Sequence, residues 1–516
     1  MLRVLMLLFI VHCTCLPEAK AQSSFIVGFK QAEFSIWDEG LGITETFDRG
    51  YAVSGRFDYD HFVIVRIDSN GNYLWDRQFG DVYLAYGMSI IEASDSGLAM
   101  CGFRFPSQSG DVELVVIRLD QSGDTLWTKA FAESNGIRGH SIHQSPDGGF
   151  VIGGFVHVWS NDYNGMVMKL NADGSVAWSN QYAAPMVFQG YSLEATADSG
   201  YVLVGEVDLG VYSGVGLLKI DQNGNTEWFR TYAFGLGCIG YGVKQALNLD
   251  LLITGSIRDT MPPYNTNAML MRTSSGGNVL WTKAYSTGAH CGGKDLVVKE
   301  DGEIVVAATS SSSNYPVWII RTDSAGNVIG SVMHPGGSSS ADVGTIQHTS
   351  DGGFIMVGGS GYTPNGNITV TKMDSTGSSL CDQDSLSFST FSRPVSSTIE
   401  SITTSTAGSP ISGNLSVTGG LITYDFCNGT SSVEGSLSTN LSSLLIHPNP
   451  STGQITISGP GEGGEIICTI YNSLGELLLT QKLDDSALDV SGLRSGVYFL
   501  KANVEGTSQG VRFVKL

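Results

Sequence analysis

The segment KIDQNGNTEW at residues 219–228 carries oxygen-bearing side chains on alternate positions, a pattern that could bind calcium. Its Asp221, Asn223 and Asn225 match the first three ligand positions of a calcium loop. Such a loop also needs glycine at its sixth position and a chelating glutamate at its twelfth. Counted from Asp221, glycine falls at the fourth position and the twelfth residue is Tyr232. We therefore expect no metal ion here, and no motif in the chain suggests a cofactor.

A tight turn explains the segment better than a metal loop does. A type I turn favours aspartate at its first position, where the carboxylate accepts a backbone N–H, and glycine at its fourth. The same spacing recurs along the chain, with Ser274–Gly277 as a variant. We therefore expect turns of one repeated element. The copies are Asp68–Gly71, Asp120–Gly123, Asn171–Gly174, Asp221–Gly224, Asp323–Gly326 and Asp374–Gly377.

A tryptophan follows most copies of the turn and sets a period of about 50 residues. A second motif, such as PDGGFVIGG at 146–154, recurs in phase with it. Each unit is predicted to be two hairpins, because its short apolar runs are bounded by Asp and Gly turns. Seven such units predict an all-β fold, a seven-bladed β-propeller over residues 22–385, with a long solenoid as the alternative. The tryptophans are Trp75, Trp127, Trp178, Trp228 and Trp281.

The segment FIVGFK at 25–30 precedes the first unit. We predict that it forms a strand of the last blade, because this closure would lock the ring and remove two open edges. The repeats resemble the divergent propeller repeats of exported bacterial proteins, with DGG and KLDxxGxxxW signatures, more closely than kelch or WD repeats. They also resemble the sialidase Asp-box, with longer spacing. Basic residues that share one register before the turn, such as Arg66 and Lys219, are expected to be structural.

The N-terminus has the features of a signal peptide over residues 1–21. Arg3 supplies the positive end, residues 4–11 the apolar stretch, and AKA at 19–21 the cleavage site. The formal net charge of −21 argues against nucleic acid, whose phosphates need lysine and arginine. The same negative charge argues against docking on a surface of anionic lipid. We expect no transmembrane helix, because no segment reaches the roughly 20 apolar residues that a span requires.

The longer connections between strands are expected to carry function. The two tight turns of each blade must share one face, here called the tight-turn face, and the longer connections share the opposite loop face. Aromatic residues in these connections could stack on sugar rings or could pack between blades. Arg138 and His140 belong to the same face, and no catalytic motif is present. The aromatic candidates are Tyr59, Phe105, Trp159, Tyr163, Tyr212, Tyr264, Tyr315 and Tyr362.

Four cysteines are candidates for disulfides, which export permits. Cys238 and Cys291 occupy equivalent places in neighbouring units, so they could be bridged or could be two separate core residues. Cys381 and Cys427 flank a Ser/Thr-rich stretch, and we predict a bridge between them. This stretch belongs to an extension and linker over residues 386–443.

Alternating apolar residues and glycine turns predict a small immunoglobulin-like β-sandwich over residues 444–516. This module resembles the type A C-terminal sorting domain of type IX secretion. The resemblance implies the type IX machinery as a partner, export across the outer membrane, and then attachment to the cell surface or release. The residues that carry it are Pro448, Asn449, Pro450, Gly453, Gly475, Leu493, Gly496, Tyr498 and Lys515.

These features together predict an exported propeller that binds a surface glycan or a protein through its loop face. One alternative is a propeller hydrolase or lyase acting on polysaccharide, which would need carboxylates that converge in the channel. Another is a structural component of a surface layer.

Overall fold

The computed structural model describes residues 24–515, except for the segments given at the end of this paragraph. The described chain separates into two compact units, residues 1–431 and residues 432–516, and each is considered by itself. The segments outside the description are 31–37, 58–59, 81–82, 108–110, 160–161, 184–186, 235, 261, 287, 311–315, 335–342, 361–366, 380–388, 393–395, 400–402, 407–408, 412–415, 419–421, 426–444, 448–453, 459–465, 473–476, 484–486, 495 and 505–506.

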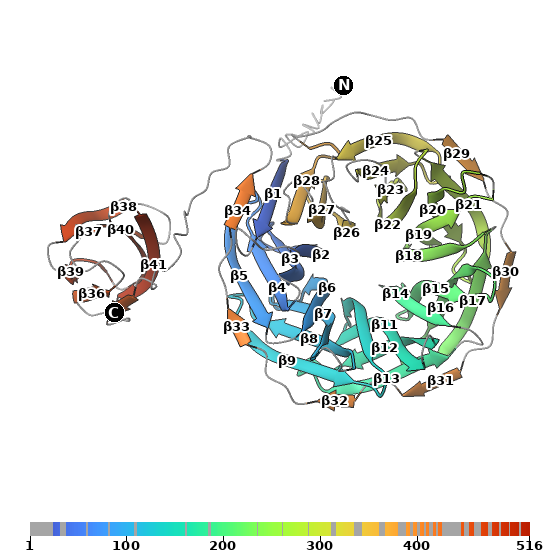
Figure 1. The fold of residues 1–516 in the computed structure, drawn as a ribbon, viewed down its shortest axis with the longest axis horizontal. Helices are drawn as coiled ribbons and strands as arrows, with labels where there is room; N and C mark the ends of the chain where they lie inside the picture. Colours follow the sequence, from blue (N-terminus) through green and yellow to red (C-terminus); the bar gives the residue numbers. More distant parts are fainter. Residues whose placement is uncertain are drawn as a thin grey trace, which may run out of the picture. The chain divides into compact units, whose positions relative to one another are not determined.

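The first unit is a ring of seven antiparallel sheets, the blades of a propeller, numbered I to VII here (Figure 1). Blades I to III consist of β2 (Glu39–Glu45), β3 (Tyr51–Phe57), β4 (His61–Ile67) and β5 (Tyr73–Gly80); β6 (Leu84–Glu92), β7 (Leu98–Phe105), β8 (Glu113–Leu119) and β9 (Thr125–Ala132); and β10 (Ile137–Gln144), β11 (Phe150–Trp159), β12 (Asp162–Leu170) and β13 (Val176–Ala183). Blades IV to VI consist of β14 (Phe188–Ala195), β15 (Tyr201–Asp208), β16 (Ser213–Ile220) and β17 (Thr226–Ala233); β18 (Cys238–Gln245), β19 (Leu251–Arg258), β20 (Thr266–Thr273) and β21 (Val279–Ser286); and β22 (Cys291–Val298), β23 (Ile304–Ser310), β24 (Val317–Thr322) and β25 (Val328–His334).

Blade VII is closed by the N-terminal strand. It consists of β26 (Val343–His348), β27 (Phe354–Ser360), β28 (Asn367–Met373) and β1 (Phe25–Lys30). β1 pairs antiparallel with β28, with Val27 opposite Val370. The prediction that the first strand completes the last blade is confirmed.

A series of six short strands follows blade VII and lies along the outer rim of the ring (Figure 1). Their order around the ring is the reverse of the blade order, from blade V back to blade I and then to β1 of blade VII. Blade VI has four strands among the described residues. We call this series the rim belt; sequence analysis treated the segment only as an extension. The strands are β29 (Ser389–Ser392), β30 (Ser396–Ile399), β31 (Thr403–Thr406), β32 (Ser409–Ile411), β33 (Ser416–Thr418) and β34 (Ile422–Asp425).

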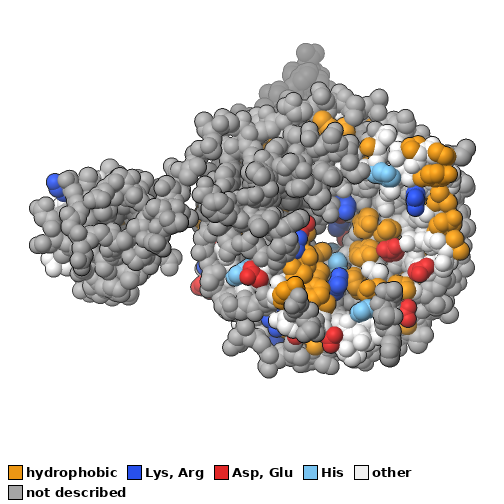
Figure 2. All heavy atoms as spheres, viewed as in Figure 1, with side chains coloured by type: hydrophobic (Ala, Val, Ile, Leu, Met, Phe, Trp, Pro, Cys, Tyr) orange, Lys and Arg blue, Asp and Glu red, His pale blue; other side chains and the backbone are white. Residues whose placement is uncertain are grey.

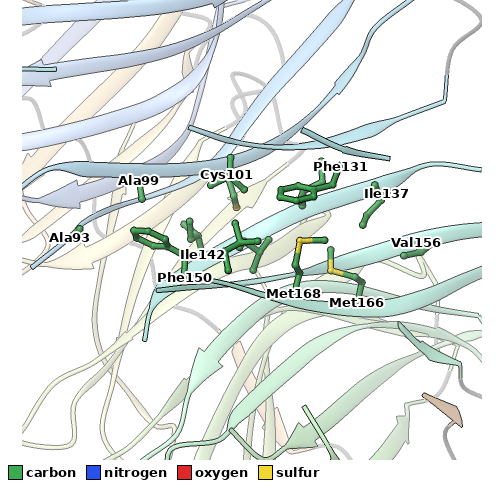
Figure 3. Packing of buried hydrophobic residues seen from close by; sticks show 14 residues of the cluster. Ala93, Ala99, Cys101, Phe131, Ile137, Ile142, Phe150, Val156, Met166 and Met168 are labelled. Atoms are coloured by element: carbon green, nitrogen blue, oxygen red, sulfur yellow. The ribbon is translucent and has the colours of Figure 1, made fainter. Parts of the chain in front are cut away.

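Apolar side chains fill the spaces between neighbouring blades. Figure 3 shows Cys101 and Phe131 of blade II beside Ile142, Phe150 and Met168 of blade III, all essentially inaccessible to water. The strands next to the inner ones are buried on both faces, because a blade packs against each side. In β3, for example, every residue is buried. Burial of this apolar surface is the main favourable contribution to folding of the ring.

The repeated turn lies at the junction between blades. Gly224 donates its backbone N–H to the Asp221 carbonyl at 3.1 Å and has a φ of +81°. One carboxylate oxygen of Asp221 accepts the backbone N–H groups of Asn223 and Asn225, each at 2.8 Å. The other accepts the Asn225 amide, also at 2.8 Å. Both carboxylate oxygens are therefore used in holding the turn.

Each turn is also held by the preceding blade. The Tyr182 hydroxyl of blade III donates to the Gly224 carbonyl at 2.9 Å. The Trp178 ring lies against the same glycine, so that an added Cβ would be 2.9 Å from it. Tyr232 repeats the contact with the Gly277 carbonyl at 2.7 Å. The aromatic residue that stands where a calcium loop has glutamate thus joins one blade to the next.

The basic residues of the turn motif form ion pairs within their own blades. Arg66 on β4 lies 2.5 Å from Asp48 in the turn between β2 and β3. Lys372 on β28 lies 2.8 Å from Asp351 in the corresponding turn of blade VII. Their structural role follows from this geometry, because they connect the two tight turns of a blade. The other pairs are Arg118–Asp95, Lys169–Asp147, Lys219–Asp198, Arg272–Asp250 and Arg321–Glu303.

Of the two alternatives for Cys238 and Cys291, the disulfide is wrong and two separate core residues is right, because both residues are free and buried. Cys238 packs in the core between blades IV and V, and Cys291 packs in the core between blades V and VI. Their thiols donate instead to the carbonyls of Tyr232 and Tyr285, each at 3.4 Å. Equivalent places in neighbouring blades face different cores. The other candidates, Cys381 and Cys427, lie outside the described residues.

The second unit contains two antiparallel sheets, β35-β36-β39 and β38-β37-β40-β41. Its immunoglobulin-like arrangement stays a prediction. Tyr498 is buried, and its hydroxyl donates to the Arg494 carbonyl at 2.8 Å. Leu493 lies in the turn before β40, Gly496 begins that strand, and Lys515 ends β41; Pro448, Asn449, Pro450, Gly453 and Gly475 lie outside the described residues. The strands are β35 (Leu445–His447), β36 (Gln454–Ser458), β37 (Ile466–Asn472), β38 (Leu477–Leu483), β39 (Ala487–Asp489), β40 (Gly496–Val504) and β41 (Thr507–Lys515).

Candidate functional site: the central channel

The inner strand of each blade carries a bulge that turns one residue out of the regular pairing. In blade III the pairing shifts between Gly139 and Ser141, which leaves His140 as the extra residue. Bulges bend a strand and re-aim a side chain, and they recur near functional sites. Blade VII has a similar irregularity over residues 344–345. In the other blades the extra residues are Leu41, Met88, Tyr191, Tyr241 and Lys294.

Glycine precedes these bulged residues because neighbouring blades approach closely there. A Cβ on Gly190 would lie 2.6 Å from the Gly154 carbonyl oxygen of the preceding blade. Gly154 itself has no room for a side chain, because its Cβ would meet the Arg138 carbonyl oxygen at 1.9 Å. The sequence signal is a glycine followed by a variable residue near the start of each inner strand, and sequence analysis did not use it.

The bulged residues surround a cavity of about 640 Å³ in the central channel. Its lining includes His140, Tyr191, Tyr241 and Lys294. Inner strands begin at the loop face, because the turn that follows each of them lies at the tight-turn face. The bulges lie near the start of these strands, so the bulged residues are on the loop-face side of the cavity. Figure 2 shows hydrophobic, basic and histidine side chains around the middle of the ring.

Aromatic rings form a continuous arc on this side of the channel. The Tyr191 ring lies 5.7 Å from the rings of both Tyr241 and His140, between centroids. His140 stacks on Phe155 at 5.2 Å, and Phe155 meets Tyr163 edge-on at 5.3 Å. We call these five residues the aromatic arc. They come from blades III, IV and V. His140, Tyr191 and Tyr241 line the cavity, and aromatic rings with a few polar atoms are common in ligand pockets.

His140 contributes to the arc as a neutral ring. Its pKa falls to about 3, because burial disfavours the imidazolium and Arg138 repels it. Its Nε2 atom is buried and accepts no hydrogen bond from any described residue. His140 is therefore uncharged at neutral pH, and its Nε2 atom keeps an unused capacity to accept a hydrogen bond.

Charged side chains lie farther along the inner strands, toward the tight-turn face. Lys244 of blade V lies 3.0 Å from Glu194 of blade IV. Asp295 of blade VI accepts the backbone N–H groups of Leu296 at 2.8 Å and Ile346 at 3.1 Å. Burial raises the pKa of Asp295, although Lys244 and these two N–H groups oppose the shift. Sequence analysis missed the three charged residues, because they lie on the inner strands of three consecutive blades and only the packing of those blades brings them together.

The predicted ligand-binding residues divide into two groups. Tyr163 and His140 belong to the aromatic arc, and Arg138 and Phe105 lie beside it, with the Arg138 guanidinium carbon 5.7 Å from the Phe105 ring centre. Tyr212 and Tyr264 are 46% and 43% exposed and make no ring contact with the arc within the described part of the chain. Trp159 ends β11, and its side chain lies outside the description, as do Tyr59, Tyr315 and Tyr362.

The described residues hold no cluster of three or more histidine, cysteine, aspartate or glutamate side chains arranged to bind a metal ion. Within the same residues, no helix is long and apolar enough to cross a membrane.

Comparison with known families settles the identity of the second unit. Residues 445–515 match the family described as the secretion system C-terminal sorting domain. The terminal unit is a type IX sorting domain. Because the type IX sorting domain directs its carrier out of the cell, the protein is exported to the cell surface or secreted.

Other comparisons give weaker likenesses. PorZ, a surface component of the type IX secretion system of Porphyromonas gingivalis, is 10% identical with a TM-score of 0.40. The alignment covers 92% of this chain and 59% of PorZ. A protein of unknown function from Dyadobacter fermentans is 11% identical with a TM-score of 0.39, over 55% of this chain and 93% of its own. No curated protein matches the sequence. These scores are too low to support any argument about function.

Proposed function

We propose that the protein is an exported binding protein whose ligand enters the central channel from the loop face and rests on the aromatic arc. The type IX sorting domain would deliver it to the surface or the medium. The observation that carries the proposal is the arc itself, five rings from three blades, of which His140, Tyr191 and Tyr241 line a cavity of about 640 Å³.

A glycan is the ligand that suits this surface best. The apolar faces of sugar rings can lie against aromatic side chains, while their hydroxyls need a small number of polar groups. The arc offers both, because the Tyr241 ring lies beside the Lys294 ammonium at 5.0 Å and the His140 Nε2 atom has no partner among the described residues.

The test uses the mature chain, residues 22–516, on a glycan array, followed by calorimetry with the glycans that bind. Y191A and Y241A should each weaken binding about tenfold or more, since a stacked aromatic pair contributes roughly 0.5–1.5 kcal/mol beyond its buried area. Y212A is the matched control, because Tyr212 is an exposed tyrosine on the same face but outside the arc. Equal effects of all three variants, or no bound glycan at all, would contradict the proposal.

A polysaccharide hydrolase or lyase is the second candidate. Glycoside hydrolases commonly use one protonated and one ionised carboxylic group. The raised pKa of Asp295, which lines the cavity together with Lys244, the ion-pair partner of Glu194, favours this candidate. The engagement of Glu194 with Lys244 and of Asp295 with two backbone N–H groups speaks against it.

Activity assays separate the two candidates. Wild type, D295N and E194Q are incubated with the glycans that bind, and new reducing ends or unsaturated products are measured. A catalytic channel requires turnover by wild type and its loss in both variants. Binding without turnover excludes the second candidate for those glycans and leaves the first in place.

A further inference from the structure

Arg138 lies beside the aromatic arc in a setting without a carboxylate. Its guanidinium carbon is 4.9 Å from the ring centre of Phe103 and 5.5 Å from that of Phe155. Phe155 is also its cross-strand neighbour on β11. Among the described residues Arg138 forms no ion pair with any aspartate or glutamate.

Two other arginines, at the same end of blades I and II, have acidic partners. Arg56 in blade I lies 2.8 Å from Glu39, and Arg104 in blade II lies 2.7 Å from Glu113. Glu39 and Arg138 occupy the same register, each one residue before the glycine that precedes the bulge. The fold therefore has room for a neutralising carboxylate at such places, and a chain with a net charge of −21 does not lack carboxylates.

A positive charge in such surroundings is costly unless something neutralises it. Burial lowers the pKa of Arg138, which measures the cost of keeping it charged. Cation–π attraction to three aromatic rings offsets part of this desolvation penalty. An anionic ligand would offset more of the penalty, because a hydrogen bond between charged groups is strong in a site that largely excludes water.

A small cavity adjoins the guanidinium. It has a volume of about 60 Å³ and is lined by Arg138, Phe155, His157 and Tyr163, together with Val112 and Gly136. This space equals about two water molecules. It can take a carboxylate group but not a sugar ring, whose place would be on the aromatic arc, to which Phe155 and Tyr163 of this lining belong.

His157 adds a second polar atom to the small cavity. Its Nδ1 atom lies 3.1 Å from the Asn135 carbonyl, so the proton of the neutral ring is on Nδ1. The Nε2 atom is then an acceptor, and it is buried with no partner among the described residues. Tyr163 stacks on the ring at 4.8 Å and fixes its orientation. A cationic donor and a ring nitrogen without a partner among the described residues therefore belong to the lining of one cavity.

We propose that this cavity binds the carboxylate of an acidic sugar, with the Arg138 guanidinium donating to the carboxylate and a neighbouring sugar hydroxyl donating to Nε2 of His157. The inference rests on the proposed function, because the rest of the glycan lies on the aromatic arc. A carboxylate and a hydroxyl on adjacent carbons are features of uronic acids, and this pairing matches the donor and the acceptor of the cavity.

The experiment compares oligogalacturonate, whose non-reducing terminal residue keeps a free hydroxyl on the carbon next to the one that bears its carboxylate, with the same oligosaccharide after reduction of its carboxylates, using calorimetry on the mature chain. Wild type should bind the acidic form about tenfold to a hundredfold more tightly, the range expected for a hydrogen bond to a charged group. R138Q should remove this difference by weakening only the acidic form. R138K should fall between, since lysine keeps the charge without the planar fork. H157F keeps the ring that stacks on Tyr163 and should weaken both forms by removing the acceptor.

R258Q is the matched control. Arg258 in blade V holds the place of His157, since the backbone N–H groups of both donate to a glycine of the preceding connection, Gly237 and Gly136, at 2.9 Å. It is exposed, so its removal takes away one positive charge from the same face without touching the cavity. R258Q should bind both forms as wild type does. Thermal melting of every variant identifies any that fails to fold, in which case R138K and H157F carry the test.

The outcomes distinguish this inference from the function on which it rests. Equal affinity of wild type for the acidic and the reduced form would overturn the carboxylate site and leave the glycan-binding proposal standing. An acidic preference that survives in R138Q would also overturn it, by placing the anion elsewhere. Absence of binding to both forms and to every arrayed glycan would overturn both proposals.

Discussion

Replacement of Gly224 by alanine should destabilise the propeller through contact with the preceding blade. Gly224 and Gly148 have the same φ of +81°, so alanine is equally strained at both in its backbone. They differ in their surroundings. A Cβ on Gly224 would lie 2.6 Å from the Asn180 amide nitrogen and 2.9 Å from the Trp178 ring, whereas a Cβ on Gly148 would meet nothing within 4 Å.

The magnitudes follow from these two contributions. The left-handed backbone conformation costs an L-residue about 1–2 kcal/mol, which is the full effect expected for G148A. Overpacking adds about 1–3 kcal/mol, so G224A should lose about 2–5 kcal/mol. The residues at the place of Gly148 in the other blades agree with the open space around it. Four blades have a non-glycine residue with positive φ at that place, namely Arg49, Ser96, Ser199 and Leu249. The turn that contains Gly224 has glycine in all seven blades.

Equilibrium urea titrations of wild type, G148A and G224A, monitored by tryptophan fluorescence, measure the free energy of unfolding. The two variants have the same composition, so their difference does not depend on the denatured chain. A difference of about 1–3 kcal/mol in favour of G148A is expected. If both variants lose the same free energy of unfolding, the Trp178 ring can move away from an added Cβ at no cost. That result would refute the view that these turns join the blades.

Three further predictions concern stability and accessibility. Y232F removes the hydroxyl that donates to the Gly277 carbonyl and should cost about 0.5–1.5 kcal/mol in the same titration, more if the carbonyl stays buried without a donor; no loss would mean that the bond is replaced. Hydrogen bonding by Lys169 lowers the pKa of Asp147 to about 2, and Thr196 and Lys219 lower that of Asp198 to about 2 against the opposing effect of burial. Because these folded-state pKa values lie below the ordinary aspartate value of 3.8, the stabilisation is present above pH 3.8 and is lost as pH falls toward 2. The melting temperature should therefore drop across that window, and D198N should flatten the drop. Cys238 and Cys291 should resist alkylation in the folded protein and react in urea, and rapid labelling of either in native buffer would contradict their burial.

The sequence predicted the features of the ring that have a local origin. The Asp–Gly spacing, the tryptophan and the apolar hairpins each recur within one unit, and they were enough to give the blade number. The bulges were not predicted, because a bulge depends on the approach of the next blade to Gly190 and its equivalents. The grouping of Glu194, Lys244 and Asp295 was likewise not visible, since the three residues lie on different inner strands.

The rim belt was missed for another reason. Its strands are short and rich in serine and threonine, such as Thr403–Thr406, and lack the alternation that identifies a half-buried strand. Their pairing depends on the outer strands that they meet, whose free backbone N–H and C=O groups accept an added strand almost irrespective of its side chains. A prediction of this kind requires knowledge of the assembled ring.

Through the rim belt, the first strand of the propeller and the last strand of the belt hold each other in place. β1 lies between β28 and β34, so the first strand of the protein is held on one side by the last blade and on the other by the last strand of the belt. A chain that emerges through a secretion channel from one end can complete this blade only after both ends are outside. A pull applied from the side of the sorting domain would meet β34 first, and then β33, β32 and the remaining belt strands one blade at a time. Under such tension the belt strands would therefore detach in a series of small separate steps. The blades themselves would come under tension only after the belt strands had detached.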